Sequence, residues 1–304
     1  MAAVHVGISG WRYTPWRGDF YPKGLVQKNE LHFASRAVSS IEINGSFYSL
    51  QKPELYANWY ADTPQGFVFS VKAPRYVTHI RRLQDIEKPI ANFFASGIFN
   101  LREKLGPILW QFPPSFKFNP EVFEAFLRLL PADTEAALEA ARGCDPRMEG
   151  RSCLEIDRKR RMRHAVEIRH ESFVDPAFVA LLRQYQVALV VADTAGKWPY
   201  REDLTSDFVY IRLHGAEQLY TSGYTPEALD EWCRRISLWR DGSQPEDAHL
   251  ISQVAPSRRK SRDVYCYFDN DVKVRAPYDA RGLLERLGLD ADLETTPGQL
   301  QGDK

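Results

Sequence analysis

Three short apolar stretches of the chain end in pairs of polar residues that lie two positions apart. The pairs are Glu42 with Asn44, Glu167 with Arg169, and Arg212 with His214. Residues two positions apart in an extended strand point to the same face, so each pair would present both side chains together. Carboxylates and histidines can transfer protons or bind metal ions, and arginines bind anionic groups. These pairs are therefore the first candidates for a functional site.

Five residues at the ends of such stretches are our candidate catalytic groups. They are Glu42, Lys72, Glu167, Asp193 and His214. We expect His214 to act as an acid or a base, because histidine titrates near neutral pH. Carboxylates at strand ends can also bind divalent metal ions. The candidate ligands of such an ion, whose presence the sequence leaves open, are Glu167, Asp193 and Asp269.

Lys72 follows Ser70 on the inward-facing positions of its predicted strand. A lysine buried among apolar side chains could form a Schiff base with a carbonyl compound. Glu42 and Glu167 are expected nearby, however, and would keep the ammonium group charged. We therefore favour anion binding or ion pairing over a Schiff base for Lys72.

A second group of residues could bind a ligand rather than react with it. Aromatic rings gather in the first loop and after the second strand, where they could stack on sugars or bases or form a small core over the barrel. Asn270 and Asp271 could bind hydroxyl groups or a cation, or could form a turn. The predicted ligand-binding residues are Trp11, Tyr13, Trp16, Asn44, Tyr48, His79, Gln111, Arg169, Arg212, Asn270 and Asp271.

The charged candidates also allow a purely structural interpretation. They comprise three charges of each sign: Glu42, Glu167 and Asp193 against Lys72, Arg169 and Arg212. Buried charges cost several kcal/mol unless they are paired, and a balanced set can pair internally. A site for a polar or phosphorylated ligand needs the same balance, so both interpretations stay open at this point.

Eight apolar stretches bounded by turn residues have the length of buried strands. They are Val4–Ser9, Ser39–Asn44, Phe67–Lys72, Pro107–Phe112, His164–Arg169, Val187–Asp193, Phe208–His214 and Val264–Asp269. The helical patterns between and after them are Asn29–Val38, Glu54–Ala61, Ile90–Lys104, Glu121–Leu130, Pro176–Tyr185, Pro226–Trp239 and Ala280–Leu287. Alternating strands and helices predict a parallel sheet, and eight units fit an α/β fold of the (β/α)8 TIM-barrel type. A doubly wound open sheet is less favoured, because no glycine-rich phosphate-binding motif follows the first strand.

A single barrel domain is predicted over residues 1–289, with a charged insertion at about residues 131–163 between the fourth and fifth strands. Residues 290–304 are polar and predict a flexible tail. The basic runs in the insertion and at Ser257–Asp263 both precede strands. We expect them at the amino-end face, away from the carboxyl ends of the strands where barrel enzymes carry their sites.

The composition excludes several classes of protein. The 304 residues include 40 lysines and arginines and 40 aspartates and glutamates, so the formal net charge is zero, which argues against a dedicated coat for nucleic acid or anionic membrane. Four cysteines without a C-x-x-C pair are too few for a disulfide scaffold and lack zinc-ligand spacing. The first residues lack the pattern of a secretory signal and no stretch has the length of a membrane span, so we expect a cytoplasmic protein.

Seven sequence segments, taken together and in order, resemble the YecE-like family (domain of unknown function 72). They extend along nearly the whole length of the chain. They are GISGWRYTPWRGDFYP (7–22), IEINGSFYSL (41–50), FVFSVKAPRYVTH (67–79), GPILWQFPPSF (106–116), HAVEIRHESF (164–173), DFVYIRLHG (207–215) and VYCYFDND (264–271). The resemblance implies a TIM-type barrel and a loose relation to sugar isomerases, with no established activity. The chain departs from the family in its charged insertion and in Gly45, where serine is common.

Two hypotheses for function follow. The first is a barrel enzyme that acts on a polyhydroxylated or phosphorylated small molecule by sugar-isomerase-like acid–base chemistry, with Lys72, Arg169 and Arg212 holding anionic groups. The second is a nucleic-acid-binding or phosphodiester-processing barrel, or a non-catalytic binding module, that uses its aromatic and arginine residues. A common glycosidase arrangement is excluded, because the ends of the fourth and seventh strands, which would need carboxylates, hold Gln111 and Arg212 with His214.

Overall fold

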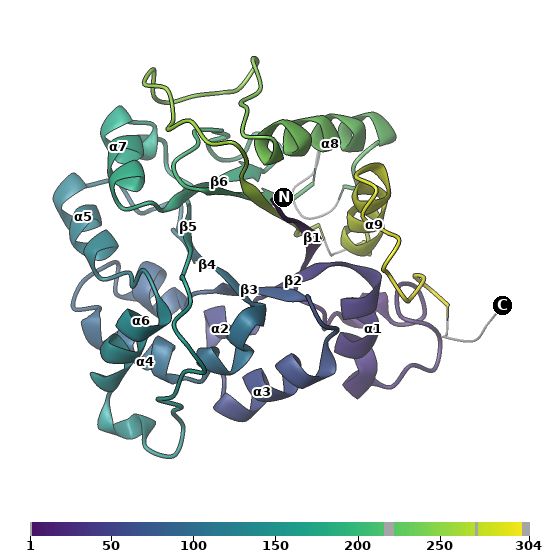
Figure 1. Ribbon diagram of the computed structural model, residues 1–304, viewed down its shortest axis with the longest axis horizontal. Coiled ribbons are helices and arrows are strands. Elements are labelled where there is room, and N and C mark those ends of the chain that lie inside the picture. Colours follow the sequence, from purple (N-terminus) through teal and green to yellow (C-terminus); the bar gives the residue numbers. More distant parts are fainter. Residues whose placement is uncertain (1, 216–221, 271–272, 300–304) are drawn as a thin grey trace.

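Eight parallel strands form a closed barrel in the computed structural model, in the order in which they occur in the chain (Figure 1). The structure describes residues 2–215, 222–270 and 273–299. The strands are β1 (Val4–Ser9), β2 (Ser40–Ile43), β3 (Val68–Lys72), β4 (Leu105–Gln111), β5 (His164–Glu167), β6 (Ala188–Asp193), β7 (Phe208–Leu213) and β8 (Asp263–Phe268). Pairing of Val4 with Val264 through to Ile8 with Phe268 closes the ring. The predicted (β/α)8 barrel is therefore confirmed.

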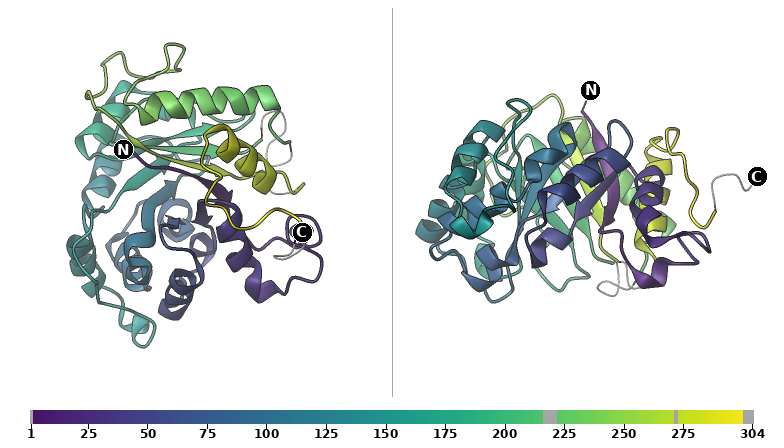
Figure 2. Two further views of the ribbon diagram at one scale, coloured as in Figure 1. Left: turned by 45° about the vertical axis from the view of Figure 1, so that its right-hand side comes forward. Right: turned by 90° about the horizontal axis from the view of Figure 1, so that it is seen from below.

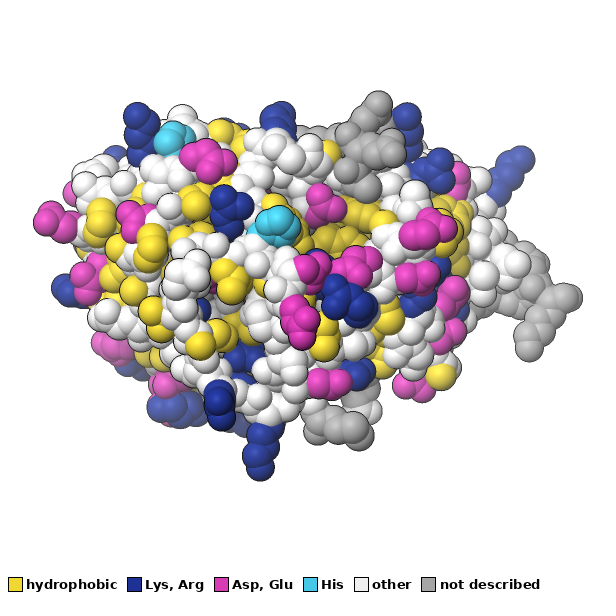
Figure 3. Space-filling view, turned by 90° about the horizontal axis from the view of Figure 1, so that it is seen from above, with side chains coloured by type: hydrophobic (Ala, Val, Ile, Leu, Met, Phe, Trp, Pro, Cys, Tyr) yellow, Lys and Arg dark blue, Asp and Glu magenta, His cyan; other side chains and the backbone are white. Residues whose placement is uncertain are grey.

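Helices surround the barrel on its outside. They are α1 (Glu30–Ala37), α2 (Gly45–Tyr48), α3 (Pro53–Asp62), α4 (Glu87–Ala95), α5 (Pro120–Arg128), α6 (Thr134–Arg142), α7 (Pro176–Gln184), α8 (Pro226–Arg240) and α9 (Ala276–Arg286). None of the helices in the described ranges is both long enough and apolar enough to cross a membrane. On the face shown in Figure 3, acidic and basic side chains are interspersed.

All eight predicted strands lie within two residues of the observed ones, but one predicted helix is wrong. The helix expected at 90–104 is two elements, because α4 ends at Ala95 and a 3-10 helix follows at Ile98–Lys104. Gly97 separates them with a φ of +108°, a conformation that side chains disfavour. A Cβ at this position would also lie 2.4 Å from the Cα of Pro53. The short helix α2 was not predicted.

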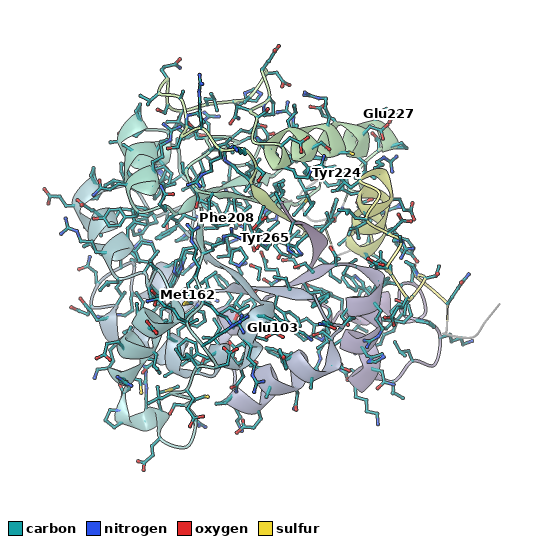
Figure 4. All side chains as sticks on the ribbon, viewed as in Figure 1. Glu103, Met162, Phe208, Tyr224, Glu227 and Tyr265 are labelled. Carbon is teal, nitrogen blue, oxygen red and sulfur yellow. The ribbon has the colours of Figure 1, made fainter. Side chains whose placement is uncertain are left out.

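Large aromatic side chains on β7 and β8 fill much of the interior of the barrel. Phe208, Tyr210, Tyr265 and Tyr267 on β7 and β8 project inward, whereas Ala165, Ala188 and Ala192 occupy the inner face of β5 and β6. Large rings therefore face small side chains, which fills the space without overpacking. Phe208 and Tyr265 lie within the ring of strands in Figure 4. These inward-facing side chains pack below the carboxyl ends of the strands. The carboxyl ends are therefore where a functional site can lie.

The amino-end mouth is closed by ion pairs. Arg163, just before β5, contacts Asp207 at 3.2 Å and Asp263 at 2.7 Å, and its guanidinium also donates to the Tyr265 hydroxyl at 3.1 Å. Burial would lower the pKa of Arg163, but these groups raise it above its ordinary value. Arg163 is therefore a cation that links three strands.

The stretch between β4 and β5 and the end of the chain both pack on the barrel. Helix α6 buries Ala137 and Ala141 completely, and a single β-bridge joins Asp133 to Arg161. After α9 the chain returns to α1, where the Thr295 hydroxyl donates to the Phe33 carbonyl at 3.0 Å. Figure 2 shows these last described residues beside the amino-terminal part of the chain. Residues 290–299 are thus held against the barrel.

Candidate functional site

A fully buried arginine lies at the centre of the carboxyl-end mouth. Arg212 projects inward from β7 with none of its surface exposed. Its guanidinium donates to both oxygens of Glu42, at 2.9 and 3.1 Å, to Glu167 at 2.7 Å and to Asp269 at 2.8 Å. Three carboxylates from β2, β5 and the end of β8 therefore surround one cation. The sequence predicted that these side chains converge, because each occupies an inward position at the end of its strand.

Other side chains also donate hydrogen bonds to two of these carboxylates. The Tyr210 hydroxyl donates to Glu42 at 2.6 Å, and the Ser9 hydroxyl donates to the other Glu42 oxygen. Glu167 accepts from Gln111 at 3.0 Å and from Arg169 at 2.8 Å. The carboxylates are thus held in fixed orientations by the protein itself.

The arginines and the carboxylates of this cluster stabilise one another's charges. Burial alone would raise the pKa of Glu167, but Arg169 and Arg212 outweigh it and hold that pKa well below its ordinary value. The pKa of Asp269 is lowered in the same way, against the effect of burial, by Arg212 and by the hydrogen bond from His214. Burial would lower the pKa of Arg212, but the surrounding carboxylates raise it well above the ordinary value. All three groups are therefore ionised at neutral pH.

Lys72 lies at the edge of this cluster, and its contacts differ from those of Arg212. Its Nζ lies 4.3 Å from the centre of the Phe47 ring. Within the described ranges, no acceptor lies within hydrogen-bonding distance of that nitrogen and no carboxylate lies within 4.0 Å of it. Burial, and then the charge of Arg212, lowers the pKa of Lys72 to about 8, although Glu42, Asp269 and Glu167 oppose the shift. Lys72 is thus a largely buried ammonium group that titrates close to neutral pH.

Two further side chains line the rim next to Lys72. His79 lies on a turn of π-helix (Tyr76–Ile80) and packs edge-on against Phe47, with 5.1 Å between ring centres. Burial, followed by the charges of Arg169 and Arg75, lowers its pKa to about 4, so the imidazole is neutral at pH 7. The guanidinium of Arg169 stacks 3.8 Å from the centre of the Trp198 ring.

His214 and Asp193 were both predicted as catalytic, but the structure places them in different surroundings. His214 is buried beside the cluster, with Nδ1 3.0 Å from Asp269 and Nε2 3.3 Å from Arg212. Asp193 accepts a hydrogen bond from the Tyr224 hydroxyl at 2.9 Å, and burial raises its pKa. In Figure 4, Tyr224 lies outside the ring of strands, toward α8 and α9. Asp193 is therefore outside the carboxylate cluster.

The candidate metal ligands do not form one set. Glu167 and Asp269 both bind Arg212, whose guanidinium lies where an ion bridging them would have to lie, and Asp193 is turned to Tyr224. Across residues 2–215, 222–270 and 273–299, no three histidines, cysteines or carboxylates are grouped as metal ligands. These residues as arranged do not fit a shared divalent ion.

The predicted aromatic residues divide into core and surface. Trp16 is fully buried against Phe20, at 5.4 Å between ring centres, so it belongs to the core and presents no face to a ligand. The hydroxyl of Tyr13 donates to the Ser9 carbonyl at 2.5 Å. Trp11 is largely buried, whereas Tyr48 is 72% exposed.

Asn270 has a structural role that the sequence did not suggest. Its amide donates to the Ser222 carbonyl at 2.9 Å and to Asp279 of α9 at 2.8 Å, so it connects the end of β8 to α9. Asp271 lies outside the described residues.

Sequence reasoning also missed residues that shape the site. Tyr210 could have been found, because it lies two positions before Arg212 and so shares its inward face. Trp198 and Tyr224 come from loops, and no periodicity in the sequence indicates which strand end they contact.

Comparison with known proteins agrees with this architecture. The family model described as "Protein of unknown function DUF72" matches residues 5–301. The chain belongs to the DUF72 family. Among curated relatives in the family, UPF0759 protein YunF of Bacillus subtilis (strain 168) is 28% identical and covers 94% of this chain and 95% of its own. UPF0759 protein YecE of Escherichia coli (strain K12) is 22% identical over 80% of this chain and 84% of its own.

Solved structures of the same family share the fold. A DUF72 family protein from Thermotoga maritima superimposes with a TM-score of 0.70 at 24% identity, covering 94% of this chain and 99% of its own. One from Enterococcus faecalis gives a TM-score of 0.68 at 17% identity, covering 98% and 99%. At these identities the likeness concerns the fold alone.

Proposed function

We propose that the protein is an enzyme that binds a polyhydroxylated or phosphorylated small molecule at the carboxyl-end mouth of the barrel, with Lys72 as the group that meets the ligand. The observation that carries this proposal is the contrast between the two buried cations. Arg212 is bound by three carboxylates, whereas Lys72 makes no ion pair within 4.0 Å among the described residues. A buried charge that the fold leaves unpaired destabilises the protein, and such groups occur preferentially at functional sites.

The surroundings of Lys72 favour an anionic or oxygen-rich ligand. Arg169 lies on the same side of the mouth, because its charge and that of Lys72 both lower the pKa of His79. Two cations beside a neutral imidazole form a site that can hold a phosphate, carboxylate or enolate oxygen. Glu42, Glu167 and Asp269 orient Arg212 and set the local field, since Arg212 already occupies them.

Acid–base chemistry is the reaction type that suits these groups. With a pKa of about 8, Lys72 is mostly protonated at pH 7 and can donate a proton to a developing oxyanion. The neutral imidazole of His79 can accept a proton. Transfer of a proton at a carbon next to a carbonyl group, as in aldose–ketose interconversion, would use both functions. This extends the isomerase-like hypothesis without requiring a metal ion.

Binding of defined sugars tests the proposal. Ribose 5-phosphate and ribose would be titrated against the protein by ligand-observed NMR, and we expect the phosphorylated sugar to bind more tightly. Lys72→Met should weaken its binding by about tenfold or more, because a charge-assisted contact is lost. Lys260→Met, which changes an exposed lysine ahead of β8, is the matched control and should leave binding unchanged.

Proton exchange tests the chemistry separately from binding. Incubation of the bound sugar in deuterium oxide should incorporate deuterium at the carbon next to the carbonyl, and Lys72→Met should abolish this. Equal binding by the wild type and Lys72→Met would refute the proposed site. Preferential binding of single-stranded oligonucleotides with a steep dependence on salt would favour the nucleic-acid hypothesis instead.

A further inference from the structure

Two adjoining pockets are lined by residues of α2, of α4 and of the insertion between β4 and β5. The smaller has a volume of about 220 Å³ and is called the ring pocket, and the larger has about 350 Å³ and is called the basic pocket. Leu50 and Arg147 line both, so the two pockets are continuous and together reach the size of a small-molecule site. Lys72 lines neither of them.

The ring pocket presents aromatic surface to solvent. Tyr48 is 72% exposed and Tyr76 is 47% exposed, and both line this pocket. Tyr48 is held edge to face against Phe47, with 5.2 Å between ring centres. Aromatic rings that stay exposed on a protein surface can stack on the planar ring of a ligand.

One buried side chain of the ring pocket has an unused hydrogen-bond donor. Asn92 of α4 is only 2% exposed, and its Oδ1 atom accepts from the backbone N–H of Asp145 at 2.7 Å. A backbone N–H can only donate, so the oxygen of the Asn92 amide must face Asp145 and the nitrogen must point elsewhere. That nitrogen makes no hydrogen bond to a residue in the described ranges, and it is not among the unpaired polar atoms that are sealed from solvent. Because Asn92 lines the ring pocket, a ligand there can reach this donor.

The charged side chains that line the basic pocket are all cations. They are Lys52, Arg147 and Arg151. No described carboxylate lies within 4.0 Å of the charged nitrogens of Lys52 or Arg151, and Arg147 has only Asp145, at 3.8 Å. That distance is longer than a hydrogen bond, so the guanidinium donors of Arg147 stay available. Arginines with free donors are well suited to bind phosphate.

We propose that the two pockets together bind a pyrimidine nucleotide. The base lies against the rings of Tyr48 and Tyr76, a carbonyl oxygen of the base accepts from the Asn92 amide nitrogen, and the phosphate binds Arg147 and Arg151. A pyrimidine matches the ring pocket because it is a single planar ring with a carbonyl acceptor on its edge, which a hydrocarbon ring lacks. The proposal does not depend on the reaction at the mouth, and it gives a role to the charged insertion, which that reaction does not use.

Three probes separate the contributions of the base and the phosphate. Uridine 5′-monophosphate carries both, uridine lacks the phosphate, and ribose 5-phosphate lacks the base. The titrations use the Lys72→Met variant, so that binding of a sugar phosphate at the mouth does not contribute and failure of either proposal can be told apart. By isothermal titration calorimetry we expect saturable binding of uridine 5′-monophosphate, with uridine and ribose 5-phosphate each about tenfold weaker or more. No saturable binding of the nucleotide, or equally tight binding of either partial probe, would overturn the proposal.

Matched variants in the same background test the location of the site. Asn92→Asp keeps the oxygen that accepts from Asp145 and removes the donor, so it should weaken nucleotide binding by about tenfold or more. Arg147→Gln, at an exposed position, should have a similar effect through loss of a phosphate contact. Arg142→Gln is the control, because it changes an arginine of the insertion with 61% of its side chain exposed, against 70% for Arg147, that lines neither pocket. Unchanged binding in Asn92→Asp or Arg147→Gln, or an equal loss in Arg142→Gln, would place the nucleotide elsewhere and overturn the assignment.

Discussion

Arg212 and Glu42 form a two-point ion pair inside the barrel, with Nη2 2.9 Å from Oε1 and Nε 3.1 Å from Oε2 and with neither side chain exposed. The other donors of Arg212 reach Glu167, Asp269 and Ser9. A guanidinium group has five N–H donors, and here the protein accepts from every nitrogen. All three nitrogens of Arg212 are therefore engaged within the protein, and the guanidinium fixes the positions of the carboxylates around it.

Replacing Arg212 by methionine should destabilise the protein strongly. Breaking a buried ion pair by removing one partner costs about 3–5 kcal/mol, because the other charges stay buried without compensation. Urea unfolding at pH 7 measures the change. Arg142→Met, which breaks an exposed pair with Glu139 on α6, is the control and should have little effect. Similar small effects in both variants would contradict the structural role of Arg212.

The same variant should alter how stability depends on acid. The folded pKa values of Glu167 and Asp269 lie below their ordinary values of 4.5 and 3.8, so the native state binds fewer protons than the unfolded chain in acid. The stabilisation from these carboxylates is present above that range and is lost as the pH falls through it. Without Arg212 the pKa depression shrinks, and the fall in stability below about pH 4.5 should be shallower. An unchanged slope would be inconsistent with this account.

Because of Lys72, the free energy of unfolding should rise as the pH is raised into mild alkali. Its folded pKa of about 8 lies below its ordinary 10.5, so between these values the unfolded chain binds more protons and stability rises with pH. Relative to Lys72→Met, the wild type should gain up to about 3 kcal/mol across this window. Denaturant unfolding at several pH values from 7.5 upward measures the difference. A constant difference between the two proteins would show that the Lys72 pKa is not lowered.

His79 should stay neutral to an unusually low pH. Its pKa is lowered from 6.5 to about 4 by burial and by Arg169, so its ring protons should titrate near pH 4 in an NMR experiment. Arg169→Met removes the second of these causes and should raise the midpoint. Between pH 6.5 and 4 the native state binds fewer protons than the unfolded chain, so His79 lowers stability as the pH falls. A wild-type midpoint near 6.5 would refute the burial of His79 beside these cations.

The two kinds of aromatic residue near the mouth should respond differently to truncation. Trp16 is fully buried, and Trp16→Ala should cost about 3–5 kcal/mol in unfolding free energy through the cavity it leaves. Tyr48 is 72% exposed, so Tyr48→Ala should change stability by only about 0.5 kcal/mol. Chemical denaturation distinguishes the two, and a large loss of stability in Tyr48→Ala would mean that its ring belongs to the core.

The sequence by itself determined the barrel and the set of side chains at its mouth. Apolar runs separated by helical patterns predicted eight parallel strands, and alternation along each strand placed Glu42, Glu167 and Arg212 on the inner face. These inferences succeed because strand periodicity is local and because parallel strands bring their carboxyl ends to one mouth. The sequence left undecided which of the charges would pair with each other.

Only the tertiary structure decided which charges are satisfied and which are not. Closure of the ring brings β7 within reach of β2 and β5 across the barrel interior, so Arg212 contacts their carboxylates, while Lys72 on β3 ends over the Phe47 ring. The alternation of side chains along strands also could not separate Trp16, in the core, from Tyr48, at the surface, because both lie in helices of three or four residues that are too short to show a period. Pairing and burial depend on distances between strands far apart in the chain, and a local pattern contains no information about those distances.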